Sequence, residues 1–481
     1  MNRLKKCLPF IFAAFLLLDV VYSFHQHTQV ELDGDMASVA LPSPSYRKVL
    51  EDPFGWSVIF NHENYAAPNR FFAHFSMSAY FKTAPALFQS ISTPIDSVYL
   101  SAAAAKTVIQ VILIYLLALY ISRQGKVTNK KWLLAAVLIT PLFQTAGYNG
   151  LMGIIDKSVD YTFFYALSMI PLLIFFYPFY TSLYEEKPFD KSWSDKLALI
   201  FLTVLLAFNG PLVPGVVIIV CTMITIGLFM KYYGKESTGT WIQKTITSII
   251  KLKGPLFTFL VFAGILCLYS LYIGTHNLEN DETIPVLQRY ARVPFGLLEV
   301  FTQKIGMPLI LITLAVNIVL VKKFRQVEEG KKIMTLFKVL SLFCILYIMI
   351  LPLGGYRAYR PDIVRRDTIL PVTLCLFFMF GYSSYFIMQQ ITFAYKKFYY
   401  GFIAVILLLF TIADASIKAD NACEKEALQA IADSPKDVVE LHTDCKVMAW
   451  GKMTDPEQSR VNGEMLYHWG ILSKPKLYYQ K

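Results

Sequence analysis

Eleven apolar runs recur along this chain of 481 residues, and they constrain its fold more than any other feature. A helix needs about 20 residues to cross the roughly 30 Å hydrocarbon core of a bilayer. With 55% apolar and only 16% charged residues, the chain has too little polar surface to cover several soluble cores. We therefore predict an all-α polytopic membrane protein with about 11 transmembrane helices, over residues 8–23, 101–122, 132–147, 161–180, 197–209, 211–230, 255–273, 307–321, 333–353, 368–388 and 399–414.

The basic residues are distributed unevenly over the loops between these runs. We attribute the net charge of +11 to membrane topology and expect no nucleic-acid partner. Cytoplasmic loops are enriched in Lys and Arg, and alternate loops here carry Arg123, Lys126, Lys130, Lys131, Lys231, Lys235, Lys251, Lys253, Lys322, Lys323, Arg325, Lys331 and Lys332. This pattern predicts a cytoplasmic N-terminus and an extracytoplasmic C-terminus.

The first apolar run has a second interpretation, a cleaved signal peptide, because Arg3, Lys5 and Lys6 precede it. The run contains Asp19 and ends without a clear small-x-small cleavage site, which favours a retained membrane anchor. Both interpretations place the chain from residue 24 onward outside.

The chain divides into a membrane core over residues 1–414 and a small outer tail over residues 415–481. The core includes a large first outer loop, residues 24–100, whose aromatic residues have the spacing of short amphipathic helices on a membrane surface. Prolines separate these helices. The aromatic and apolar residues concerned are Phe54, Trp56, Ile59, Phe60, Phe71, Phe72, Phe75 and Tyr80.

The tail has the pattern of a small mixed domain, with a helix over residues 424–431 and strands over residues 438–441 and 447–450. Cys423 and Cys445 lie in this tail, where an oxidising compartment permits a disulfide, and two free thiols are the alternative. The chain has no Asn-x-Ser/Thr acceptor, which favours a bacterial cytoplasmic membrane.

An acidic cluster directly follows the first apolar run. In an extended segment the side chains of Glu31, Asp33 and Asp35 project to one face. Such a cluster can hold a divalent cation, or it can supply one carboxylate as a general base. The structural alternative is that Asp35 caps a short helix through Met36 to Leu41, with Gly34 at the turn.

A second cluster, residues 354–367, lies in a short outer loop between the ninth and tenth runs. Its four arginines oppose the expected charge bias of outer loops, so an anionic ligand is expected. Guanidinium groups suit phosphate oxygens, and neighbouring tyrosines supply stacking surfaces. The residues are Tyr356, Arg357, Tyr359, Arg360, Arg365 and Arg366, and in the alternative interpretation Asp362 and Asp367 neutralise two of the arginines while lipid headgroups meet the rest.

The order of these parts resembles the GT-C superfamily of integral membrane glycosyltransferases. The resemblance rests on an inside N-terminus, a first span followed at once by an acidic motif (here Glu31, Asp33 and Asp35), a large first outer loop, many further spans and an outer terminal domain. It covers the whole chain in architecture and only a few residues in motif, and no subfamily signature is matched.

The resemblance implies transfer of a sugar from a polyprenyl-phosphate carrier to a cell-envelope acceptor at the outer face of the membrane. Asp33 or Asp35 would be the catalytic acid-base group. Glu31, Arg357, Tyr359, Arg360, Arg365 and Arg366 would bind the substrate. Some relatives use a metal such as Mg²⁺ or Mn²⁺, for which Asp33 and Asp35 would be ligands, and others use none. The alternatives are a flippase for a lipid-linked oligosaccharide and an envelope polysaccharide polymerase.

Overall fold

The computed structural model describes residues 2–235, 240–280, 284–324, 326–357, 360–391 and 393–481, and these residues are mostly helical. Within them, nine helical segments are long and apolar enough to cross a membrane. They belong to α1 (Asn2–His27), α6 (Pro94–Ser122), α10 (Leu167–Tyr184), α12 (Val213–Lys235), α14 (Pro255–Gly274), α16 (Gly306–Lys323), α17 (Glu328–Ile350), α18 (Leu370–Gln390) and α19 (Phe393–Ala413). The prediction of an all-α polytopic membrane protein is confirmed at this level.

Two of the predicted spans form helices shorter than a full crossing. The run at 132–147 becomes α7 (Lys130–Ile139), and a 3-10 turn with Pro141, η1 (Thr140–Leu142), follows it. Proline has no N–H to continue the helical ladder, so the α-helix stops there. The run at 197–209 becomes α11 (Trp193–Ala207), which has 15 residues. The exact count of 11 spans is therefore not confirmed.

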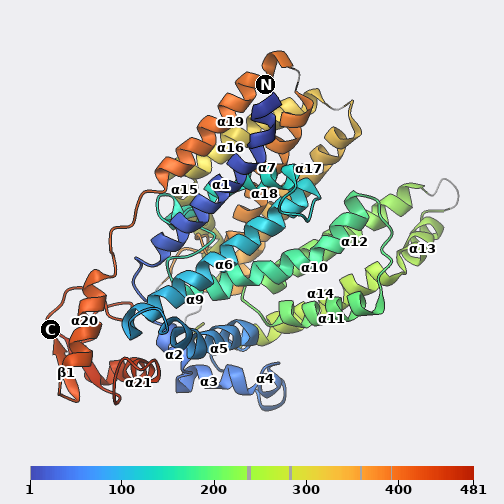
Figure 1. Cartoon of the computed structure of the whole chain (residues 1–481). Coiled ribbons are helices and arrows are strands. Elements are labelled where there is room, and N and C mark those ends of the chain that lie inside the picture. The colour runs from blue at the N-terminus through green and yellow to red at the C-terminus, as the bar shows by residue number, and fades with distance from the viewer. Residues whose placement is uncertain (1, 236–239, 281–283, 325, 358–359, 392) are drawn as a thin grey trace.

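The helices pack into one bundle whose most enclosed member is α18. The most apolar window of α18 is 94% buried, and this helix contacts α6, α7, α16 and α17. On another side, α12 packs against α14 and against α13 (Trp241–Leu252), which connects them in the chain. Figure 1 shows the N-terminus at one end of the bundle and the C-terminal tail beyond the other. We call the first the N-terminal end. We call the second the site end, because the cavity described in the next subsection opens there.

Short helices of the first loop gather at the site end (Figure 1). They are α2 (Met36–Ala40), α3 (Pro44–Glu51), α4 (Trp56–Asn61) and α5 (Phe71–Phe88). The helix that contains α10 also begins there, as α9 (Val159–Tyr161) followed by a π-helical turn, η2 (Thr162–Ala166). Two further helices, α8 (Asn149–Met152) and α15 (Val286–Thr302), contribute residues to the lining of a cavity at this end.

The tail is a small unit with two helices and a parallel strand pair. It contains α20 (Ala422–Asp433), β1 (Val438–Leu441), η4 (Pro456–Ser459), α21 (Arg460–His468) and β2 (Leu477–Gln480), and Val438 pairs with Leu477. The predicted helix, first strand and Cys423–Cys445 disulfide are confirmed. The predicted strand over 447–450 is wrong, because Met448 has a positive φ of 48° that interrupts an extended conformation.

A buried carboxylate fastens the tail to the membrane core. Glu424 accepts hydrogen bonds of 2.8 Å from the backbone N–H of Leu32, the hydroxyl of Tyr99 and the backbone N–H of Met448. Burial raises the pKa of Glu424 to about 7, although these three donors act in the opposite direction. The first loop, a membrane helix and the tail therefore meet at one side chain.

Candidate functional site

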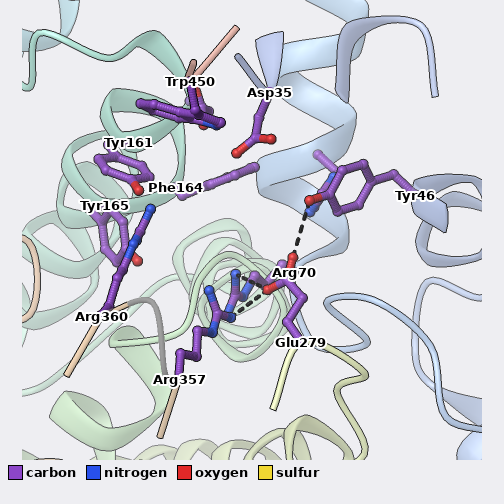
Figure 2. A pocket seen from close by; sticks show the side chains of 12 residues that line it. Asp35, Tyr46, Arg70, Tyr161, Phe164, Tyr165, Glu279, Arg357, Arg360 and Trp450 are labelled. Atoms are coloured by element: carbon purple, nitrogen blue, oxygen red, sulfur yellow. Dashed lines mark hydrogen bonds and ion pairs between the residues drawn. The ribbon is translucent and has the colours of Figure 1, made fainter. Parts of the chain in front are cut away.

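A cavity of about 430 Å³ opens at the site end, where segments from the whole chain meet. Figure 2 shows its charged and aromatic lining, which comes from the first loop, the start of the α9 to α10 helix, two later loops and the tail. Its residues are Asp35, Tyr46, Arg70, His74, Asp160, Tyr161, Phe164, Tyr165, Glu279, Arg357, Arg360 and Trp450. Six of these twelve residues are charged and five carry Tyr, Phe or Trp rings, so the cavity suits a ligand with both ionic and ring-shaped parts.

Asp35 occupies the N-cap position of α2, but its carboxylate makes no capping hydrogen bond. The side chain lines the cavity instead. Burial raises the pKa of Asp35, and the nearby charge of Asp33 adds to this shift, against a hydrogen bond from Trp450. A carboxylate with a raised pKa is better matched to proton transfer near neutral pH than an exposed one.

Two arginines share one carboxylate on the opposite wall (Figure 2). Glu279 forms a close ion pair with Arg357, lies 3.9 Å from the Nη1 atom of Arg70, and accepts a 3.1 Å hydrogen bond from the hydroxyl of Tyr46. Although burial alone would raise it, the two guanidinium groups hold the pKa of Glu279 below its usual value. At this wall two guanidinium groups meet one carboxylate, and over the whole lining three arginines stand against three carboxylates.

Another wall of the cavity is a stack of side chains from three parts of the chain. The guanidinium of Arg360 lies 4.8 Å from the centroid of the Tyr161 ring, and the ring of Trp450 stacks on Tyr161 at 5.9 Å. Trp450 reaches this position because the tail packs tightly on Gly34. A Cβ atom at Gly34 would lie 2.5 Å from the backbone nitrogen of Trp450, so a larger residue there would displace the tail.

A second cavity of about 320 Å³ adjoins the first, with Tyr161 and Arg360 as lining shared by both. Arg365 and Arg366 line it, and each has an acidic partner. Arg365 donates two hydrogen bonds of 3.1 Å to Asp367. Arg366 pairs with Asp156 and donates a 2.9 Å hydrogen bond to Asn149.

The predicted acidic residues do not converge on one point. The turn at Gly34 and Asp35 ends the extended alternation, and only Asp35 of the three lines either cavity. The Oδ2 atom of Asp33 instead accepts a 2.6 Å hydrogen bond from the backbone N–H of Val159, at the start of a helix. Burial raises the pKa of Glu31, which lies near Lys446 of the tail.

Among the predicted arginines, Arg357 and Arg360 share the first cavity with Asp35, and Arg360, Arg365 and Arg366 share the second. Tyr356, whose ring lies 5.2 Å from the guanidinium of Arg292, is buried. Tyr359 and Arg325 lie outside the described residues.

The carboxylates of the first cavity do not form a complete cation site by themselves. No cluster of three or more His, Cys, Asp or Glu side chains is arranged to hold a metal ion in the part of the chain that the structure describes. Asp33 is engaged with a backbone N–H, as given above. Asp35 and Asp160 would need oxygen ligands from the substrate or water to complete the shell of Mg²⁺ or Mn²⁺. We therefore derive no step through a metal.

Several lining residues were not predicted from the sequence, namely Arg70, Asp160, Glu279 and Trp450. Arg70, Asp160, Glu279 and Trp450 lie in four separate segments of the chain, so no spacing along the sequence connects them. One signal was available for Asp160, which is fully buried at the start of an apolar run, where an ionisable residue is rare unless it has a role. No protein-family model matches the chain, and no curated protein is significantly similar to it.

Proposed function

We propose that the protein is a glycosyltransferase that uses a polyprenyl-phosphate-linked sugar at the outer face of a bacterial cytoplasmic membrane. The observation that carries the proposal is that Asp35, Arg357 and Arg360 line one cavity, although about 320 residues separate the acidic cluster from the arginine loop. A group suited to deprotonate an acceptor thus lies beside groups suited to bind a phosphate.

In the proposed reaction, Asp35 takes the proton of an acceptor hydroxyl while the oxygen of that hydroxyl attacks the anomeric carbon of the donor sugar. The bond from that carbon to the phosphate oxygen breaks, and the polyprenyl phosphate leaves with the electron pair. Arg357 and Arg360 stabilise the negative charge that grows on the phosphate. The wall of Tyr161 and Trp450 supplies aromatic surface for the sugar ring.

The remaining arginines extend this arrangement. Arg365 and Arg366 line the adjoining cavity, and their acidic partners hold the guanidinium groups in place. A carrier phosphate at Arg360 would lie at the boundary between the cavities, since this side chain lines both. The sugar would then occupy the first cavity, beside Asp35.

The flippase and polymerase alternatives use the same arginines differently. A flippase would bind the phosphate without breaking a bond. A polymerase that works through its arginine loop would keep its activity without the acidic cluster. The carboxylate of Asp35 is the feature that distinguishes the proposal from both, because it faces the cavity without a capping role.

The test measures release of undecaprenyl phosphate, by mass spectrometry, from undecaprenyl-phosphate monosaccharides added to permeabilised membranes that contain the protein. We expect wild-type protein to release it, and Asp35→Asn to lower the rate by about 10²- to 10⁴-fold, the usual contribution of a general base. Thermal melting of the purified variant checks that it is folded.

Three other results would contradict the proposal. An intact donor in the wild-type sample, together with movement of the donor between leaflets, would indicate a flippase. Full turnover in Asp35→Asn and in the double variant Asp33→Asn/Asp35→Asn, with loss in Arg357→Ala, would indicate the polymerase mechanism. An intact donor that does not change leaflet would exclude all three functions for these donors.

A further inference from the structure

Two polar atoms beside the first cavity are buried and have no hydrogen-bond partner among the described residues: Nε of Arg70 and Nε2 of His74. Both side chains line the cavity. His74 is only 2% exposed, so its imidazole is buried in the wall of the cavity. Buried polar groups are almost always hydrogen bonded in native proteins, and an unsatisfied one costs about 1–3 kcal/mol. Two such atoms facing one cavity indicate a ligand that completes them.

The two side chains are neighbours because Arg70 and His74 are four residues apart at the start of α5. The backbone N–H of His74 donates a 3.1 Å hydrogen bond to the carbonyl of Arg70. Two aromatic rings pack against the imidazole, with the Tyr46 centroid at 5.2 Å and the Phe164 centroid at 4.9 Å. The position of the imidazole is therefore set before any ligand binds.

The chemistry of these two atoms selects a neutral hydroxyl group. Burial, and then the charge of Arg70, lower the pKa of His74 to about 3, so its imidazole is neutral at physiological pH. The Nε of Arg70 is a donor, and a neutral imidazole nitrogen can accept. One hydroxyl both accepts and donates, so it can satisfy both atoms.

An anion fits this corner less well than a hydroxyl group does. Arg70 already shares its charge with Glu279, whose carboxylate lies 3.9 Å away. Asp35 and Asp160 line the same cavity and oppose a second negative charge. The arginines assigned to phosphate, Arg357 and Arg360, come from a different loop. The corner at Arg70 and His74 thus has the properties of a polyol site.

We propose that Arg70 and His74 bind one hydroxyl group of the transferred sugar, and that His74 is a specificity-determining residue for that sugar. This inference rests on the proposed function, because it identifies the part of the donor sugar that the cavity binds. A site built to bond a hydroxyl discriminates against an analogue that lacks it, since its own polar atoms are then left unpaired.

The test measures binding of undecaprenyl-phosphate monosaccharides to the full-length protein in detergent by native mass spectrometry. A panel of pentoses and hexoses first identifies the sugar that wild-type protein binds best. Single deoxy analogues of that sugar are then compared. We expect one analogue to bind about tenfold more weakly to wild type, as the loss of one hydrogen bond in a buried site implies.

The variant His74→Phe keeps an aromatic ring between Tyr46 and Phe164 but removes the nitrogen atoms. In this variant, the preference for the parent sugar over the same deoxy analogue is expected to fall severalfold, because only the hydrogen bond from Arg70 remains. His442→Phe, the same change at a side chain that is 76% exposed in the tail, should retain the tenfold preference. If His74→Phe does not fold, His74→Asn tests the same point, because it keeps a polar group in a different position and should reduce the preference.

An unchanged preference in the folded His74 variants would overturn the inference and leave the proposed function intact. Equal binding of all deoxy analogues to wild type would also overturn it, and would indicate that water occupies the corner. Failure of wild-type protein to bind any undecaprenyl-phosphate sugar would contradict the proposed function itself, and the inference with it.

Discussion

Two clusters of arginine, carboxylate and tyrosine lie at opposite ends of the bundle, and only one of them lines a cavity. At the N-terminal end, Arg123 pairs with Glu329 and lies 3.6 Å from Glu185, which also pairs with Lys187, so two cations face two anions. At the site end, Arg70 and Arg357 share Glu279. The charges of the first cluster are matched within the packed helices, whereas those of the second line a cavity that a ligand can enter.

The tyrosines of the two clusters also differ in the interactions that they make. The hydroxyls of Tyr184 and Tyr382 are 2.8 Å apart, and Tyr382 donates to Glu329, so the cluster at the N-terminal end is closed on itself. At the site end, Tyr161 stacks with Arg360 and Trp450 around open space. The same residue types thus fasten helices at one end and form a candidate binding site at the other.

The largest difference between the two ends is expected from matched arginine substitutions. Arg357→Ala should lower donor turnover by about 10- to 100-fold, because it removes a charge-assisted hydrogen bond worth about 1.5–3 kcal/mol. Arg123→Ala should leave turnover unchanged and lower the melting temperature. The turnover assay with purified variants, normalised to folded protein, measures both. Equal loss of turnover in the two variants would show that the clusters do not differ in function.

A smaller effect, on stability, is expected from Glu424, which attaches the tail at the site end. The pKa of Glu424 is about 7 in the folded protein, above the ordinary 4.5, so the folded state holds this proton more tightly than the unfolded state. Its contribution to stability is therefore complete below about pH 4.5 and is lost as the pH rises through about 7. It is on the order of 1–3 kcal/mol.

Melting of wild-type protein between pH 5 and 8 measures this contribution. Glu424→Gln should flatten the decline in melting temperature with rising pH. Glu426→Gln, a change at an exposed residue of the same helix, should not. An identical pH dependence in wild type and Glu424→Gln would show that this carboxyl group does not control the attachment of the tail.

The smallest effect separates two carboxylates that are neighbours in the sequence. Asp33→Ala should destabilise the protein by about 0.5–2 kcal/mol, because it removes the acceptor at the start of the α9 to α10 helix. Asp33→Asn keeps an acceptor oxygen and should cost less. Both variants should retain far more turnover than Asp35→Asn. Loss of turnover in Asp33→Asn without loss of stability would instead indicate that Asp33 is the catalytic acid-base group.

Much of the fold could be predicted because the bilayer imposes a simple rule on the sequence. Long apolar runs such as 101–122 and 368–388 become helices: α6 contains the whole of the first run, and α18 contains the second from residue 370 onward. The rule fails at 132–147, where Pro141 ends a short helix inside the bundle. Hydropathy records how apolar a segment is, but it does not record where a turn interrupts it.

The site could be predicted only where its residues lie in clusters along the chain. Asp35 stood out as part of an acidic cluster directly after the first span, and Arg357 and Arg360 stood out because arginines are unusual in a short outer loop. Trp450 did not, because its position depends on the close packing of the tail against Gly34. His74 did not either, since its unpaired nitrogen is evident only when Tyr46 and Phe164 surround it.

If Asp35 and the arginines act on one lipid-linked sugar, the lipids that copurify with the protein will depend on both. Mass spectrometry would compare wild type, Asp35→Asn and Arg357→Ala/Arg360→Ala. We expect a polyprenyl-phosphate sugar to accumulate on Asp35→Asn, which binds without turnover, and to be absent from the arginine variant. Equal amounts of this lipid on both variants, or none on any of the three proteins, would contradict the account.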